Sequence, residues 1–163
     1  MITILNQHYT LKELWKLKSL LLAPLLSARR IINMFFVLYS YFTQSSSVYG
    51  APPILMVEVT TKCNLQCIMC PRQLVVQKRK EGNMDFNTFK KIIDDTEKWL
   101  FCLALWNFSE PMLNENIYEF IEYAKQKKIF VSLATNGLLL SDSNIEKIID
   151  SKLDYLIISI GSL

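Results

Sequence analysis

Short apolar runs alternate with amphipathic segments over the last two thirds of the chain. Between the runs, apolar residues recur at the three- and four-residue spacing of a helix. The runs themselves are nearly continuous, so each predicts a buried strand whose two faces are both covered. Alternating strands and helices predict an α/β fold with a parallel sheet and right-handed crossovers. The four predicted strands span residues 54–59, 100–108, 129–135 and 153–160.

The predicted helices carry start signals in the sequence. Asp85 is placed to cap the helix that follows it, and Asn114 or Asn116 is placed to cap the next one. Ser143 and Glu146 have the spacing of a capping box, which predicts the start of the last helix. The inward faces expected for these helices consist of Phe86, Phe89, Ile92, Ile93, Ile117, Phe120, Ile121, Ala124, Ile145, Ile148 and Ile149.

Residues 1–50 form a basic and apolar extension without catalytic motifs. Apolar positions in residues 11–22 suggest an amphipathic helix, which Pro24 should interrupt. No apolar run here reaches the ~18 residues that a membrane span requires. We therefore expect residues 1–43 either to pack on the domain as a pair of helices or, through their aromatic residues, to lie in a membrane interface. Residues 44–47 have the composition of a linker.

The formal charge of +3 is unevenly distributed. Residues 1–52 carry five Lys or Arg against one acidic residue, whereas residues 53–163 carry thirteen against fourteen. Because the predicted domain is nearly neutral, a nucleic acid is not expected as its principal partner. The four cysteines, three of them clustered, are too few for a disulfide framework and favour a reducing cytoplasm.

Three cysteines, Cys63, Cys67 and Cys70, follow the first predicted strand. They should therefore lie in a loop at the carboxyl ends of the strands, where α/β folds place their chemistry. Three thiolates can hold three corners of a 4Fe–4S cluster and leave the fourth iron open to another ligand. The same spacing also allows a zinc knuckle, a disulfide pair with a spare thiol, or a chance grouping.

This C-x3-C-x2-C spacing, with its lead-in Thr60–Leu65, resembles the cluster motif of the radical S-adenosylmethionine (SAM) enzymes. By this resemblance Glu110, in Asn-Phe-Ser-Glu-Pro, receives the amino group of SAM. Asn136 lies in a Thr-Asn-Gly segment like that of the same family, and Ser159, in Ser-Ile-Gly-Ser, is expected near the SAM ribose. Met69, inside the cysteine motif, takes the apolar position that packs near the adenine.

Two positions depart from the family's pattern. Ser109 stands where relatives carry glycine and could narrow the SAM pocket, and Gly161 stands where an acid is usual, which puts a ribose or substrate contact in question. Simpler structural interpretations also exist. Glu110 could be an exposed acid in a strand-to-helix turn, and Met69 could pack within its loop. Cys102, among apolar neighbours in the second predicted strand, is expected to be a core residue.

The likeness runs from about residue 54 to residue 162 and is greatest to the branch that carries an additional cluster domain (SPASM) and includes peptide-modifying enzymes. It implies that the parallel sheet is an incomplete (β/α) barrel with four of six strands, preceded by a helical N-terminal extension. The expected domains are the extension and linker at 1–50 and a partial radical SAM barrel at 51–163. Because an unpaired apolar edge strand needs a cover, a polypeptide that completes the barrel is an expected partner.

The resemblance also implies an activity. The three cysteines hold a 4Fe–4S cluster, and SAM binds the open iron. One electron from a reductant such as flavodoxin or ferredoxin cleaves SAM to a 5′-deoxyadenosyl radical, which abstracts hydrogen from an unknown substrate, with a peptide as one candidate. The alternatives are an inactive truncated remnant, a partner-dependent subunit of a split radical SAM protein, or a zinc-binding module. We expect a cytoplasmic protein. Association with a membrane through residues 1–43 is the alternative.

Overall fold

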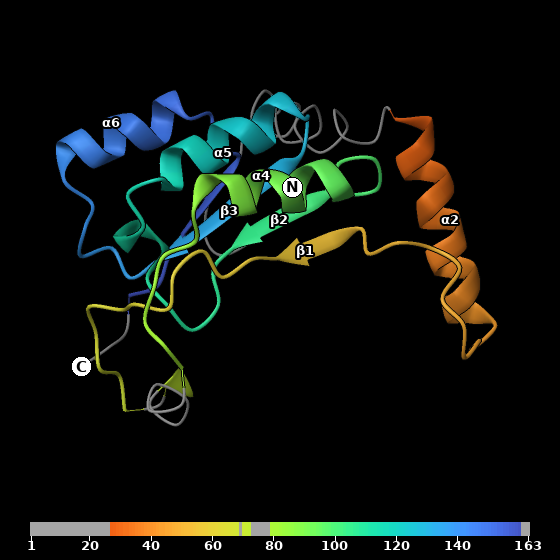
Figure 1. The fold of residues 1–163 in the computed structure, drawn as a ribbon, viewed down its shortest axis with the longest axis horizontal. Helices are drawn as coiled ribbons and strands as arrows, with labels where there is room; N and C mark the ends of the chain where they lie inside the picture. Colours follow the sequence, from red (N-terminus) through yellow and green to blue (C-terminus); the bar gives the residue numbers. More distant parts are fainter. Residues whose placement is uncertain (1–26, 69, 73–78, 161–163) are drawn as a thin grey trace, which may run out of the picture.

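The computed structural model describes residues 27–68, 70–72 and 79–160. Its centre is a four-stranded parallel sheet in which sequential strands are neighbours, in the order β1-β2-β3-β4 (Figure 1). This confirms the predicted α/β fold with a parallel sheet, and the four described strands do not close into a complete barrel. The strands are β1 (Ile54–Met56), β2 (Cys102–Leu105), β3 (Phe130–Thr135) and β4 (Tyr155–Ile158).

Three helices lie over one face of the sheet (Figure 1). They are α4 (Phe86–Thr96), α5 (Ile117–Gln126) and α6 (Asp142–Asp150). The rings of Phe89 and Phe120 stack between α4 and α5 with centroids 4.3 Å apart. The sheet residues that join this core without any exposed surface are Leu103, Leu105, Val131 and Leu133. The main core therefore lies between the helices and one face of the sheet.

The opposite face of the sheet is exposed along its two edge strands, β1 and β4, whereas Ala104 and Ser132 on the central strands are buried. Side chains alternate between the two faces of a strand, so every second residue of β1 and β4 points away from the helices. On that face Ile54 is 64% exposed, Met56 52% and Tyr155 54%. Within the described residues, the prediction that both faces are covered is therefore wrong for β1 and β4. The reason is geometric, because this is the face that a barrel would turn toward its interior.

The starts of α4 and α5 follow the predictions in part. Asp85 caps α4, since its carboxylate accepts a hydrogen bond from the Thr88 N–H at 2.9 Å. Asn116 stands at the cap position of α5 but makes no cap bond with its side chain. Instead the side-chain oxygen of Asn114 accepts the Asn116 N–H at 3.0 Å, so both asparagines take part in the start of this helix.

The start of α6 differs from the prediction. Ser141 caps this helix, because its hydroxyl oxygen accepts the Asn144 N–H at 3.3 Å. The predicted capping box of Ser143 and Glu146 is wrong because both residues lie inside the helix. Ser141, two positions before Ser143, carries the same signal and occupies the cap position.

The predicted inward face of α6 is also mostly wrong. Ile148 is buried, but Ile145 is 41% exposed and Ile149 is 69% exposed. Among the residues of α6, the last described helix, Ile148 is buried, so the helix packs on the domain along one narrow side.

A fourth long helix, α2 (Ala28–Phe42), precedes the sheet and confirms a helical N-terminal extension over these residues. Figure 1 shows it beyond the end from which the strands start, away from the cysteine loop. The helix predicted within residues 11–22 lies outside the described residues. Among the described helices, none is both long enough and apolar enough to cross a membrane.

Candidate functional site

The cysteine loop leaves the carboxyl end of β1, at the end of the sheet opposite α2 (Figure 1). Cys63 and Cys70 are half-buried, Cys67 is exposed, and all three are free thiols. The Cys70 N–H donates a hydrogen bond to the Cys67 carbonyl oxygen at 3.0 Å, which forms a turn. Met69, predicted to lie near the adenine of SAM, is outside the described residues.

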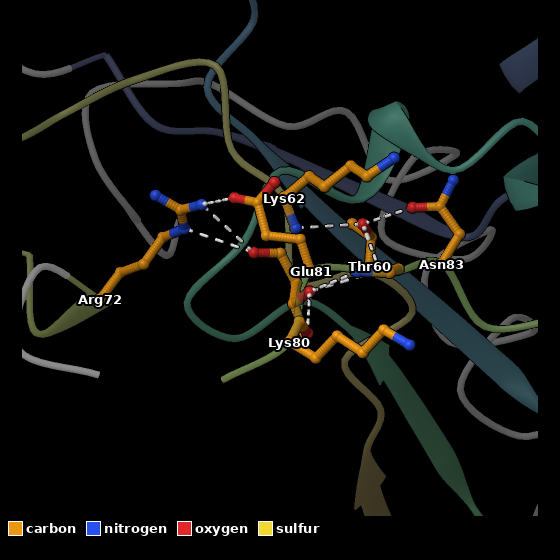
Figure 2. Close-up of polar contacts among 8 residues, drawn as sticks. Thr60, Lys62, Arg72, Lys80, Glu81 and Asn83 are labelled. Carbon is orange, nitrogen blue, oxygen red and sulfur yellow. Dashed lines mark hydrogen bonds and ion pairs between the residues drawn. The ribbon is translucent and has the colours of Figure 1, made fainter. Parts of the chain in front are cut away.

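The two ends of the loop are joined at its base (Figure 2). The Thr60 hydroxyl donates to the side-chain oxygen of Asn83 at 2.7 Å, within an isolated antiparallel bridge between these residues. The Gly82 N–H donates to the Thr61 hydroxyl oxygen at 2.9 Å. The Arg72 guanidinium reaches back to the Thr61 carbonyl oxygen at 3.3 Å. These bonds fix the start and end of the loop while leaving the cysteines between them.

Glu110 lies beside the cysteine loop and is 2% exposed. Its N–H donates to the Lys62 carbonyl oxygen at 2.9 Å. Its carboxylate accepts hydrogen bonds from the Thr135 hydroxyl at 2.7 Å, the Asn136 N–H at 2.8 Å and the Met112 N–H at 3.2 Å. The interpretation of Glu110 as an exposed acid is therefore wrong. Donors at the end of β3 and in the short 3-10 helix η3 (Pro111–Leu113) enclose the carboxylate.

Asn136 connects the end of β3 to the cysteine loop. Its side-chain N–H₂ donates to the side-chain oxygen of Asn64 at 2.7 Å, and its own side-chain oxygen accepts the Leu138 N–H at 3.0 Å. Gly137 follows with φ +82°, a conformation that strains any residue with a Cβ. A Cβ at this position would also lie 3.1 Å from Ile158. Glycine is thus required for the turn that presents Asn136 to the loop.

Ser159 lies at the end of β4 and is exposed. Its N–H donates to the Thr135 carbonyl oxygen at 2.8 Å. Together with the contacts of Glu110 and Asn136, this bond brings the predicted residues of three strand ends to one rim beside the cysteine loop. Gly161 lies outside the described residues.

Two buried polar atoms at this rim have no hydrogen-bond partner among the described residues: one carboxylate oxygen of Glu58 and the hydroxyl of Ser109. The other carboxylate oxygen of Glu58 pairs with Arg79, and this hydrogen bond raises the pKa of Arg79. Glu58 leads into the cysteine loop, and Ser109 precedes Glu110. A buried polar atom without a partner is costly, so these two atoms are available to a bound molecule.

Three polar residues of the rim were missed by sequence reasoning as site residues. Asn64 receives the Asn136 bond, and Thr135 donates to Glu110. Asn114, 1% exposed, donates to the Val59 carbonyl oxygen at 2.7 Å and so ties the segment before the cysteine loop to η3. The sequence could have identified Asn64 and Thr135 as site residues, because each of them adjoins a motif residue. Asn114 was recognised only as a helix cap.

The fourth cysteine, Cys102, lies in the first position of β2 and pairs with the first residue of β1. It is thus at the far end of the sheet from the cysteine loop. It is half-buried, and burial raises the pKa of its thiol. A raised pKa disfavours the thiolate that a metal requires, which supports the interpretation of Cys102 as a packing residue.

The chemistry of the rim fits a cluster. Three free thiols in one loop are the donor set that binds three irons of a 4Fe–4S cluster, and the unpartnered oxygens beside them suit a polar ligand. In the described residues, no three His, Cys, Asp or Glu side chains are gathered closely enough to hold a metal ion. Cluster binding therefore requires the thiols to draw together, as is usual when a metal couples to local folding.

Comparison with known proteins identifies several that are similar in sequence to this chain. The chain is 31% identical over 111 residues to the tungsten-containing aldehyde ferredoxin oxidoreductase cofactor-modifying protein of Pyrococcus furiosus, which covers 67% of this chain and 31% of that protein. It is 26% identical over 110 residues to a PqqA peptide cyclase of Gluconobacter oxydans, covering 67% of this chain and 30% of the relative. The chain thus spans about a third of the length of these curated relatives.

A solved structure shares the fold. The crystal structure of BtrN in complex with AdoMet and 2-DOIA matches with a TM-score of 0.61 and 20% sequence identity, over 69% of this chain and 48% of that chain. The sequence model of the Radical SAM superfamily matches residues 57–163, which is more than half of the chain. The chain therefore belongs to the radical SAM superfamily.

Proposed function

We propose that this chain is the part of a radical SAM enzyme that binds a 4Fe–4S cluster through Cys63, Cys67 and Cys70 and SAM at the adjoining rim. When bound, the cluster would pass one electron to SAM, whose cleavage would yield the 5′-deoxyadenosyl radical that abstracts hydrogen from a substrate. The observation that carries this proposal is the buried network around Glu110, which ties the cysteine loop to the ends of β2 and β3.

Glu110 is proposed to receive the amino group of SAM. A carboxylate offers about four acceptor positions, and the described donors use three of those on Glu110. The oxygen that faces Asn136 accepts one hydrogen bond only, so it can accept another from an ammonium group. Its burial would make such a charge-assisted bond stronger than one in water.

Further contacts are proposed for the rest of the rim. Asn136 would hold the cysteine loop in place through Asn64 and line the SAM site. Ser159, exposed at the end of β4, would contact the ribose, and Met69 would pack near the adenine. The Ser109 hydroxyl, which has no partner among the described residues, would supply a polar contact at this site.

A peptide is the proposed substrate class, because the relatives include a protein named as a peptide cyclase. A one-electron reductant such as flavodoxin or ferredoxin is the proposed redox partner, in a cytoplasmic setting. The open face and the edge strand β4 support a further polypeptide segment that completes the barrel. The proposed division is an extension at 1–50 and a partial barrel at 51–163.

A second candidate is a subunit or remnant without activity of its own. The described thiols are not gathered as a metal site, and Ile54, Met56 and Tyr155 leave the sheet face exposed. Both features are expected of a chain that needs a partner before it binds the cluster and SAM. In this case the chain has the same family membership and fold, but activity would require assembly with a partner.

Anaerobic reconstitution with iron and sulfide, followed by reduction with dithionite and chromatography for 5′-deoxyadenosine, tests the two candidates. The proposed activity predicts product from the wild-type chain and from Cys102→Ala, and none from Cys67→Ala. A cluster that forms without product supports the partner-dependent candidate. Bound zinc without iron absorption contradicts both and supports a zinc-binding module.

A further inference from the structure

Helix α2 turns its polar side toward the domain. Its buried residues are Arg30, Asn33 and Ser40, whose spacing puts them on one side of the helix. Asn33 exchanges two hydrogen bonds with the backbone of Ala51, at 2.9 and 2.8 Å. The hydroxyl oxygen of Ser40 accepts the Tyr49 N–H at 3.0 Å. These specific bonds fix which side of the helix faces the protein.

Arg30 provides the main attachment of α2. Its guanidinium donates to the carbonyl oxygens of Glu97 at 2.9 Å, Lys127 at 2.9 Å and Lys128 at 2.7 Å. Glu97 and Lys127 are the C-caps of α4 and α5, so the cation sits at the negative ends of two helix dipoles. Burial lowers the pKa of Arg30 below its ordinary value, yet arginine stays charged at neutral pH.

The outward side of α2 is apolar, which reverses the usual arrangement of a surface helix. Phe35 is 68% exposed, Tyr39 59% and Phe42 76%. Phe35, Phe36, Tyr39 and Tyr49 together line a shallow hollow on this surface. The further large apolar residues exposed on α2 are Ile31, Ile32, Leu38 and Tyr41. An apolar patch of this size on a folded domain indicates a contact surface.

Most of the charged residues beside this helix are basic, and the acidic Glu97, whose carbonyl oxygen Arg30 binds, is paired with Lys127. Along the sequence, residues 27–57 contain Arg29 and Arg30 but no Asp or Glu. Of these, Arg29 is exposed, and the exposed Lys98 and Lys128 adjoin the carbonyls that Arg30 binds. Aromatic rings bordered by basic side chains are complementary to the interface of an anionic bilayer. A partner protein with an acidic apolar groove would fit the charge but would not require so many aromatic residues.

We propose that the outward face of α2 binds the headgroup region of an anionic lipid bilayer, with its aromatic rings inserted at the interface. The helix has 15 residues and lies beyond the amino ends of the strands, so it would rest along the surface (Figure 1). The cysteine loop, at the opposite end of the sheet, would remain accessible to reductant and substrate. The inference rests on α2 and the residues beside it, and it is independent of the proposed radical chemistry.

Co-sedimentation of the full chain with vesicles tests this proposal. Vesicles of phosphatidylcholine and phosphatidylglycerol in equal parts are compared with vesicles of phosphatidylcholine alone. The expected result is binding to the anionic vesicles that falls by about tenfold or more in a Phe35→Ser, Tyr39→Ser and Phe42→Ser variant. The matched control, Ile145→Ser with Ile149→Ser on exposed positions of α6, should bind like the wild type.

A charge-reversed variant, Arg29→Glu with Lys128→Glu, provides a second test of vesicle binding and leaves the apolar face intact. Its binding should also fall, and wild-type binding should weaken as salt is added. Equal binding by the wild type and the triple variant, or no binding to anionic vesicles, overturns the proposal. Two other outcomes also overturn it: dimerisation that only the triple variant loses, or proteolysis of residues 1–26 that is faster in that variant. The first assigns the face to a second copy, and the second assigns it to residues 1–26.

Discussion

The two ends of the sheet use buried polar side chains in the same way but present opposite surfaces. At the carboxyl ends of the strands, Glu110 and Asn136 tie the cysteine loop to its neighbours and leave thiols available. At the amino ends, Arg30 and Asn33 tie α2 to the domain and leave aromatic rings available. In both regions one buried charged side chain, Glu110 or Arg30, makes several of these contacts, and charged side chains are seldom so fully buried.

The difference lies in what the polar contacts join. At the rim they join the cysteine loop to the end of β3, through the bonds of Glu110 and Asn136. At α2 they join a rigid helix to the ends of two other helices, so the apolar face has a fixed orientation. Polar contacts therefore hold the loop that carries the thiols in one region and an apolar surface in the other.

The largest effect on stability is expected from Arg30→Met. This change removes the donor that serves three carbonyl oxygens and leaves them without their partner. The free energy of unfolding should fall by about 3 kcal/mol, measured by urea denaturation. Arg29→Met, on the exposed neighbouring residue, should change it by less than about 0.5 kcal/mol. Equal unfolding midpoints for the two variants would show that α2 contributes nothing through this attachment.

A smaller loss is expected from Glu110→Gln. The amide keeps the shape of the side chain, but its N–H₂ cannot accept the bonds that the carboxylate accepts. At least one donor among Thr135, Asn136 and Met112 is then left unpaired, at a cost of about 2 kcal/mol. Affinity for SAM, measured by equilibrium dialysis after reconstitution, should fall in the same variant. Glu115→Gln, at an exposed position, is the control and should leave both quantities unchanged.

The smallest effect is expected from Asp94, whose partly exposed ion pairs provide a baseline for the buried contacts. Hydrogen bonds from Lys90, Tyr123 and Lys127 hold the pKa of this carboxyl well below its usual 3.8. Because the unfolded chain binds the proton more readily, this contribution to stability is present above about pH 4 and is lost as the pH falls further. The difference in unfolding midpoint between the wild type and Asp94→Asn should therefore shrink from pH 7 to pH 3. A difference that grows on acidification would contradict this assignment of the shift.

Much of the sheet was predictable because its causes are local. Apolar runs gave the strands, Asp85 gave the start of α4, and the cysteine spacing gave the candidate loop. The start of α6 was not predictable, since Ser141 and Ser143 carry the same local signal and packing decides between them. The exposure of Ile149 likewise depends on what lies beside the helix.

The two polar networks were beyond sequence reasoning because their partners lie far apart in the chain. Glu110 meets Thr135 and Asn136 only after β3 pairs with β2. Arg30 finds its carbonyl partners at residues 97, 127 and 128. Apolar periodicity alone would turn the aromatic side of α2 inward, whereas the structure turns it outward because the hydrogen bonds of Arg30 and Asn33 decide the orientation.

The proposed cluster, with one iron left open for SAM, is tested most directly by electron paramagnetic resonance of the reduced, reconstituted chain before and after addition of SAM. Three cysteine ligands and one free iron predict the signal of a 4Fe–4S cluster whose g-values change when SAM binds. The signal should be absent in Cys67→Ala and intact in Cys102→Ala. A cluster signal that saturating SAM leaves unchanged would contradict the claim that this rim holds SAM against the cluster.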